Sequence, residues 1–423
     1  MRRPTALNIH PRRILAVGLL TVVGPAVGLG LGAGRADAAP LGPSSCAENL
    51  SASGLTEFFT SDRAPAHGDY QRVVALPDGR SLWTFQDAYV RNKAGRAVLI
   101  HNAAMLQTGR CFELLRGGTA DAPRSWLLSD ETEQFRRWYW PLGAAITSDG
   151  QIGIFVAEMR ERGSGYLRHT EPVATWLATV DADSLEITDL QPAADASASL
   201  YGWSVTSDES WTYLYAFCYR QFGWDPLPFA PDTSAHDLQC SSELHVGRVP
   251  VGRLDQAPTY WSGSSWSVDP ADAIPVMADF ERSINPAEIH WNGELFIAVT
   301  KVGDWWGRTI HIDVAPTAHG PWRAVDELEV TPVCDGCNTY FASLVPSPAS
   351  ESGLVVGVSN NTWDGAHSSH YAPTFLSVDV LHEVSRGGKP QRSAFSLPVG
   401  TTLVAGSLGL VWSGGSAWLR RVL

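Results

Sequence analysis

Residues 68–90 read GDYQRVVALPDGRSLWTFQDAYV, and this stretch decides the fold class. Two short apolar runs, at 71–76 and 81–86, flank the turn sequence Pro77-Asp78-Gly79. Short runs rich in β-branched and aromatic residues, separated by Asp-Gly, are typical of a β-hairpin. We therefore expect the two runs to form neighbouring antiparallel strands.

The same pattern recurs along the chain and extends the prediction to a whole domain. A turn dipeptide followed by an apolar strand begins at positions 78, 149, 208, 292 and 352. A further strand follows each copy, at 102–109, 173–181, 242–249, 308–315 and 372–380. Three or four antiparallel strands repeated five times are typical of a five-bladed β-propeller. We predict an all-β fold with this propeller over residues 39–380, and a large β-sandwich is the alternative.

Composition and charge exclude several classes of protein. Of the 423 residues, 44% are hydrophobic and 18% charged, a mixture too apolar for a disordered chain. Lys and Arg number 31 against 44 Asp and Glu, so the net charge is −13. Because clustered basic residues drive nucleic-acid binding, we expect no nucleic-acid partner. No nucleotide-binding, serine-hydrolase or zinc-protease motif is present, so we expect no cofactor and no metal. We also expect a monomer.

The N-terminus has the features of a secretory signal peptide. Arg pairs at 2–3 and 12–13 precede an apolar run from Ile14 to Gly34, and Ala36-Asp37-Ala38 supplies a small-residue cleavage site. Residues 1–38 are therefore predicted to be removed on export, by the general secretory or the twin-arginine route. The expected location of the protein is extracellular.

The C-terminal segment, residues 381–423, differs from the repeats. Residues 381–396 form a polar linker, and residues 397–419 carry no charge and precede Arg420-Arg421. That length and the terminal Arg pair suit a membrane anchor that would hold the protein at the cell surface. A terminal strand or a disordered tail is the alternative.

Six cysteines follow the signal peptide, an even number that favours disulfides in an exported protein. Local pairing predicts Cys218–Cys240 and Cys334–Cys337, which leaves Cys46–Cys111. A redox motif or half of a zinc site is the alternative for Cys334 and Cys337.

Two aspartates of the first hairpin are candidates for catalysis. Pairing about the turn is predicted to place residues whose numbers sum to 157 opposite one another, such as 76 with 81. Asp69 and Asp87 sum to 156, so we expect them side by side at the end of the hairpin opposite the turn. Two neighbouring carboxyls raise the pKa of one of them, as a general acid beside a base or nucleophile requires. Turn capping by Asp is the ordinary alternative.

Polar and aromatic residues near strand ends are candidates for sugar binding. Exposed aromatic faces stack on sugar rings, and amides bind hydroxyls. The predicted substrate-binding residues are Asn102, Trp138, Trp140, Trp203, Tyr340 and Asn360. Packing between strands is the alternative for the aromatic residues. Glu158 and Glu288 also lie at strand ends, where a solvated loop position is the ordinary expectation.

The stretch 68–90 resembles the first repeat of an actinobacterial family of secreted five-bladed propellers, in which Leu-Pro-Asp-Gly-Arg precedes a strand and Gly-Asp-Thr follows it. Further matches are HVGRVPVGRL at 245–254 and the aromatic run at 259–266, and the similarity spans about 55–380. The family includes endo-D-arabinanases that act on mycobacterial cell walls. The resemblance implies a glycoside hydrolase that cleaves arabinofuranosyl linkages in D-arabinan, with Asp69 and Asp87 as the catalytic pair.

The chain departs from the family pattern at two places, and the second departure, together with the candidate membrane anchor, favours an alternative function. Gln86-Asp87-Ala88 stands where the family has Gly-Asp-Thr, and Val345-Pro346-Ser347 stands where it often has His-Pro-Glu. The second departure removes a polar pair from the last repeat. The alternative is a non-catalytic glycan-binding propeller at the cell surface, whose partner is still a polysaccharide or oligosaccharide.

Overall fold

The computed structural model describes residues 43–127, 137–162, 169–195, 199–216, 243–278, 287–302, 307–350, 352–361, 368–378 and 381. The predicted signal peptide, the uncharged segment 397–419 and the pair Cys218–Cys240 lie outside these residues. None of the helices in the described part of the chain has the length and apolarity that crossing a bilayer demands.

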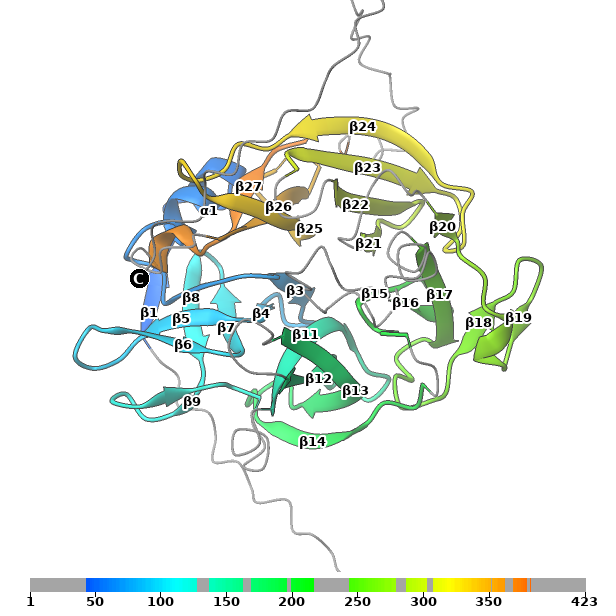
Figure 1. Ribbon diagram of the computed structural model, residues 1–423, viewed down its shortest axis with the longest axis horizontal. Coiled ribbons are helices and arrows are strands. Elements are labelled where there is room, and N and C mark those ends of the chain that lie inside the picture. The colour runs from blue at the N-terminus through cyan, green and yellow to red at the C-terminus, as the bar shows by residue number, and fades with distance from the viewer. Residues whose placement is uncertain are drawn as a thin grey trace, which may run out of the picture. The chain divides into compact units, whose positions relative to one another are not determined.

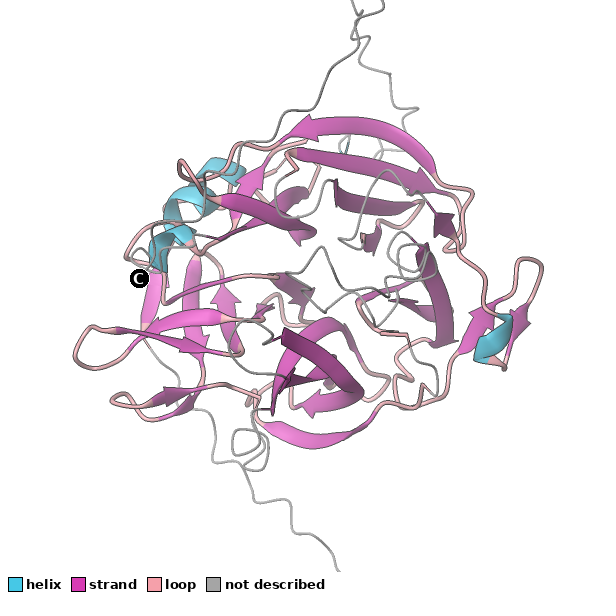
Figure 2. Ribbon diagram, in the orientation of Figure 1, coloured by secondary structure: helices cyan, strands magenta, loops and turns pink. Residues whose placement is uncertain are grey.

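The described residues form seven antiparallel sheets, five of them large (Figures 1 and 2). The first has the order β1 (Ser44–Cys46), β8 (Cys111–Leu115), β7 (Ala103–Thr108), β4 (Ser81–Phe85) and β3 (Arg72–Ala75). The second contains β11 (Arg137–Ile146), β12 (Ile152–Arg162), β13 (His169–Val180) and β14 (Ile187–Pro192). The third contains β15 (Ser204–Ser207), β16 (Trp211–Ala216), β17 (Glu243–Pro250), β18 (Thr259–Trp261) and β19 (Trp266–Ser267), with β20 (Met277–Ala278) paired to β17.

The fourth and fifth large sheets complete the series. The fourth contains β21 (Glu288–Trp291), β22 (Phe296–Val302), β23 (Thr309–Ala315) and β24 (Arg323–Glu329). The fifth contains β25 (Asn338–Pro346), β26 (Leu354–Asn361) and β27 (Thr374–Leu376). The small sheets pair β2 (Ala66–Gly68), β5 (Ala88–Arg91) and β6 (Ala97–Ile100), and β9 (Gly117–Gly118) with β10 (Pro123–Arg124). The helices are α1 (Ala52–Phe59) and the 3₁₀ turns η3 (Pro270–Asp272) and η4 (Ser368–His370).

The five large sheets follow one another in chain order around a common centre (Figure 1). One edge strand of each sheet, β3, β11, β15, β21 or β25, contacts the edge strands of the sheets before and after it, and β25 contacts β3. In the described part of the chain, five buried apolar clusters lie between successive sheets, and the last joins the fifth sheet to the first. Both faces of each sheet are thus covered, which explains the continuous apolar runs of the strands. The all-β class is confirmed, and the blade count stays a prediction.

The register of the first hairpin differs by one residue from the predicted one. β3 and β4 pair residues whose numbers sum to 156, such as Val73 with Trp83. The Leu76 N–H closes the loop and donates to the Arg80 carbonyl at 2.8 Å, and Gly79 adopts a φ of +87°. A three-residue loop that ends in a left-handed glycine is a common hairpin connection. The shorter loop accounts for the shift from 157 to 156.

Helix α1 is an element that the strand pattern did not predict. The Ser51 side chain caps its N-terminus and accepts a backbone N–H at 3.2 Å. Phe58 stacks on Phe112 of the first sheet at 4.8 Å, and Phe59 lies 5.5 Å from the ring of Phe375 in the fifth sheet. The helix therefore packs across the boundary between the first and last sheets.

Two of the predicted disulfides lie among the described residues. Cys46–Cys111 joins the paired strands β1 and β8. Cys334–Cys337 closes the loop that precedes β25. Both pairings agree with the prediction.

Candidate active site

Asp69 and Asp87 lie where the β2–β5 pairing meets the β3–β4 pairing of one long hairpin. The Asp69 N–H donates to the Asp87 carbonyl at 3.1 Å, and the Gln86 N–H donates to the Asp69 carbonyl at 3.0 Å. Tyr70 beside them has a φ of +47°, which a non-glycine residue rarely adopts and which marks the change of direction. The two aspartates are thus direct neighbours across the hairpin, in the middle of a longer pairing and not at its end as predicted.

Asp69 is the buried member of this carboxyl pair, and only 6% of its surface is exposed. Its Oδ2 accepts hydrogen bonds from the hydroxyls of Tyr340 at 2.6 Å and Tyr371 at 2.5 Å. Burial, and next the charge of Asp87, raise the pKa of Asp69 to about 7, although the tyrosine hydroxyls act in the opposite direction. Near neutral pH the carboxyl therefore carries a proton about half of the time. Since Oδ2 already accepts two hydrogen bonds, the proton belongs on the buried Oδ1, which bonds no other side chain.

A buried hydrogen-bond network joins the first sheet to the fifth, close to the contacts that Tyr340 and Tyr371 make with Asp69. The Gln71 Nε2 donates to the Ser343 hydroxyl at 2.9 Å, and its Oε1 accepts from the Ser359 hydroxyl at 2.8 Å. The same Ser359 oxygen accepts the Tyr70 N–H at 2.9 Å. Because these groups are buried and mutually satisfied, they fix the two sheets relative to each other.

Asp87 is the more open member of the pair, with 24% of its side chain exposed. Its Oδ1 accepts the Trp140 Nε1–H at 3.0 Å and lies 3.1 Å from the His101 Nδ1. A carboxylate can only accept, so Nδ1 is the imidazole nitrogen that carries a proton. Trp140 and His101 both donate to Oδ1. Within the described residues, no side chain donates to Oδ2. The second oxygen is therefore open to a ligand.

A groove of about 360 Å³ adjoins the carboxyl pair at His101. Its lining includes His101, Arg137, Trp138 and Glu161. Arg137 is held by Glu158, whose Oε1 lies 2.7 Å from the guanidinium. The volume lies in the range of small-ligand sites, and the mixed polar and aromatic lining suits a hydroxylated ligand.

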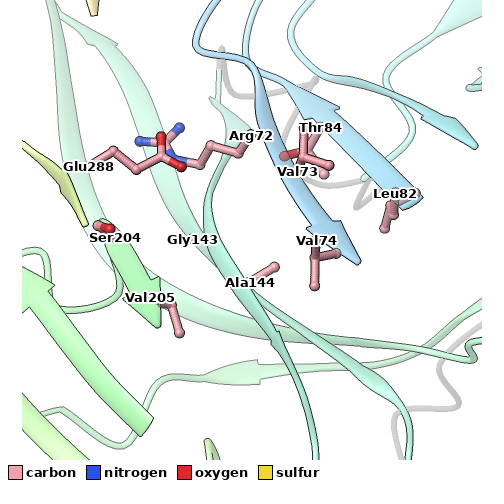
Figure 3. A pocket seen from close by; sticks show the side chains of 10 residues that line it. All are labelled: Arg72, Val73, Val74, Leu82, Thr84, Gly143, Ala144, Ser204, Val205 and Glu288. Carbon is pink, nitrogen blue, oxygen red and sulfur yellow. The ribbon is translucent and has the colours of Figure 1, made fainter. Parts of the chain in front are cut away.

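A second polar region, the central pair of Arg72 and Glu288, lies where the edge strands meet (Figure 3). The two side chains extend toward one another from β3 and β21 at a cavity of about 30 Å³, which has room for water but not for a sugar. The Arg72 guanidinium lies 4.5 Å from the Trp203 ring centre and 4.6 Å from that of Phe341. Burial raises the pKa of Glu288 to about 8, although the charge of Arg72 lowers it. Glu288, expected to be a solvated loop group, instead has a buried carboxyl oxygen.

Three of the predicted binding residues lie at the carboxyl pair. Trp140 donates to Asp87, and Tyr340 donates to Asp69. Trp138 lies under the His101 ring at 4.4 Å. Tyr340 has no exposed surface, and Trp138 is buried except where it lines the groove, so the observed contacts of both are to the site's own side chains.

The structure places Asn102, Asn360 and Trp203 inside the scaffold. The Asn102 amide donates to the carbonyls of Leu127 and Tyr139 and accepts the Leu127 N–H at 2.7 Å. The Asn360 amide holds backbone groups in the same way. Trp203 has no exposed surface and packs against Arg72. The expectation that these three residues face a sugar is corrected by their burial.

One cluster in the described part of the chain has the composition of a metal site. Cys334, Cys337 and His370 offer ligand atoms within 4.8 Å of one another. The two sulfurs are joined to each other in the disulfide. In this state they are not thiolates, the form that binds a metal.

Comparison with known proteins adds a family to this geometry. Residues 53–380, well over half of the chain, match the family described as Domain of unknown function (DUF5005). The chain belongs to the DUF5005 family. No curated protein matches this DUF5005 chain.

Several solved structures resemble the DUF5005 chain. A "putative hydrolase" from Bacteroides ovatus shares 19% identity over 77% of this chain and 88% of its own, with a TM-score of 0.57. A GH43_1 enzyme from Xanthomonas citri in complex with xylotriose shares 14% identity over 77% and 92% of the two chains, with a TM-score of 0.41. A family 43 arabinoxylan arabinofuranohydrolase from Bacillus subtilis shares 12% over 74% and 63%, with a TM-score of 0.42. The similarity to the Bacteroides ovatus protein shows a fold shared with the DUF5005 chain.

His101 and Tyr371 are residues of this DUF5005 site that sequence analysis missed. His101 directly precedes Asn102, and the prediction chose the second residue of that pair. Both residues lie in the bend between β6 and β7, where no strand periodicity indicates which side chain enters the site. Tyr371 is 302 residues from Asp69 in sequence, and no local pattern marks the contact.

Proposed function

We propose that this DUF5005 protein is an extracellular glycoside hydrolase that cleaves arabinofuranosyl linkages in cell-wall D-arabinan. We further propose that its five large sheets are the blades of a five-bladed propeller. The observation that carries the activity is the carboxyl pair, in which Asp69 and Asp87 are cross-strand neighbours in different environments. Two carboxyls whose environments separate their protonation states are the usual equipment of glycoside hydrolysis. The choice of D-arabinan comes from the resemblance of residues 68–90 to the endo-D-arabinanases.

The environments of the two aspartates favour distinct roles. Asp69, whose pKa is raised to about 7, is the general acid and transfers its proton to the leaving glycosidic oxygen as the bond to the anomeric carbon breaks. Asp87 acts through its open Oδ2, either as the base that takes a proton from water or as the nucleophile. Side chains cover Asp69 Oδ1 in this structure, so we expect them to shift when a sugar binds.

Release of oligosaccharides tests the activity directly. The purified protein, produced without residues 1–38, is incubated with D-arabinan, arabinogalactan and L-arabinan, and products are followed by chromatography and mass spectrometry. We expect products from the first two, which contain D-arabinan, and none from L-arabinan. Binding of D-arabinan without any cleavage would favour the alternative, a glycan-binding propeller.

Export and anchoring are proposed from the terminal segments alone. Residues 1–38 direct export, and residues 397–419 hold the protein at the cell surface. The test is fractionation of cells that express the full chain or a chain ending at residue 396. Release of only the shortened chain into the medium supports the anchor, and equal release of both chains overturns it.

A further inference from the structure

The His101 ring is fixed in one orientation. It stacks on Trp138 with ring centres 4.4 Å apart and an interplanar angle of 20°. Its Nδ1 lies 3.1 Å from the Asp87 Oδ1, and its backbone N–H donates to the Ser125 hydroxyl at 3.1 Å. A ring held by stacking, a side-chain contact and a backbone contact presents its remaining nitrogen, Nε2, in a defined direction.

That remaining nitrogen is suited to accept a hydrogen bond. Because Nδ1 donates to the Asp87 carboxylate, the neutral ring carries its lone pair on Nε2. The side chain is 41% exposed and lines the groove of about 360 Å³. Within the described residues, no polar group bonds Nε2. A sugar hydroxyl in the groove is a donor of the kind that this nitrogen accepts.

We propose that His101 has two separable functions, positioning Asp87 through Nδ1 and binding a hydroxyl of the glycan through Nε2. The groove beside it is then a sugar subsite next to the bond that is cleaved. This inference rests on the proposed function for its substrate, and on the geometry of His101 for the two roles. The Nδ1 contact, together with Trp140, holds Asp87 Oδ1 so that Oδ2 faces the substrate.

Two substitutions separate the roles because each amide replaces one ring nitrogen. In His101→Asn the amide nitrogen stands near the place of Nδ1 and the Nε2 acceptor is lost. In His101→Gln the amide reaches the place of Nε2 and the Nδ1 donor is lost. We expect His101→Asn to raise KM by about three- to tenfold, the usual effect of one lost neutral hydrogen bond. We expect His101→Gln to lower kcat by about 10- to 100-fold, because Asp87 is no longer held.

A remote histidine supplies the matched control. His319 stacks on Trp261 at 3.7 Å with an interplanar angle of 2°, and Trp261 belongs to β18 of the third sheet, opposite β6 in Figure 1. His319→Asn removes a similar ring stack and is expected to leave kcat and KM within about twofold of wild type. Equal effects of both His101 variants on kcat and on KM overturn the division of roles, as do wild-type values in both.

Binding measurements separate this inference from the proposed activity. D-arabinan oligosaccharides from partial acid hydrolysis are titrated calorimetrically into wild type and both His101 variants. If wild type cleaves no glycan, the proposed activity fails, but weaker binding by His101→Asn than by His101→Gln still supports the subsite. Equal binding by all three proteins, or no binding by wild type, overturns it.

Discussion

Asp69 and Glu288 each have a buried carboxyl oxygen, and burial raises their pKa values to about 7 and about 8. Their neighbours differ. Asp69 lies across the hairpin from a second carboxyl that is partly open and linked through His101 to a groove of about 360 Å³. Glu288 faces Arg72 at a cavity of about 30 Å³. A raised pKa alone therefore does not indicate chemistry, whereas a second carboxyl and room for a ligand do.

The largest difference between the carboxyl pair and the central pair is expected in turnover. Asp69→Asn and Asp87→Asn should each lower kcat on D-arabinan by about 10²- to 10⁴-fold, because each removes one partner of acid–base catalysis. Glu288→Gln, which replaces a carboxyl that is mostly protonated at neutral pH, should change kcat by no more than about twofold. Initial rates of oligosaccharide release measure all three. Full activity in either aspartate variant is incompatible with the catalytic assignment.

The central pair is expected to matter for stability instead. Arg72→Met removes a buried guanidinium that packs on two aromatic rings and donates to the carbonyls of Tyr70 and Pro141. Because Glu288 is mostly protonated near neutral pH, the cost comes from the lost ring contacts and hydrogen bonds, and we expect a loss of about 2 kcal/mol in the free energy of unfolding. Urea unfolding followed by tryptophan fluorescence measures this loss, with Arg63→Met, whose side chain is 44% exposed, as the control. If Arg72→Met lowers the free energy of unfolding no more than the control does, the central pair has no structural role.

The third expected difference is a pH dependence specific to the carboxyl pair. A general acid works when protonated, so kcat/KM should reach a plateau about one pH unit below the Asp69 pKa of about 7 and fall by about tenfold per pH unit well above it. The Glu288→Gln variant should keep this alkaline limb, since Glu288 takes no part in the reaction. Rates between pH 6 and 9 test the prediction, and a flat profile through this range contradicts it.

How far the sequence predicts the molecule depends on the distance over which each contact forms. The first hairpin is local, and its turn residues and apolar runs predict both the strands and the neighbouring aspartates. The predicted register was wrong by one residue. The turn sequence fits a loop of either three or four residues, and the structure has the three-residue loop that ends in Gly79. The predicted proximity of Asp69 and Asp87 was unaffected by this error, because residues on neighbouring strands stay close when the register shifts by one residue.

Contacts that depend on how the strands pack in three dimensions could not be predicted. Tyr340 was selected as a sugar-binding residue, but its hydroxyl is used on Asp69. Asn102 and Asn360 were selected because they are polar residues at strand ends, a position that also suits an amide that satisfies buried backbone groups. Whether such an amide binds a sugar or satisfies backbone groups depends on its burial, which the sequence does not show.

The protonation of Asp69 is the most direct test of the central claim, that one member of the carboxyl pair holds a proton beside an open carboxylate. Carbon-13 NMR of aspartate-labelled protein, with the Asp69 resonance assigned from Asp69→Asn, gives its pKa without any substrate. We predict a pKa of about 7 in wild type. A lower value is expected in Asp87→Asn, where the neighbouring charge is gone. An Asp69 that titrates near 4, as an ordinary aspartate does, would contradict the account.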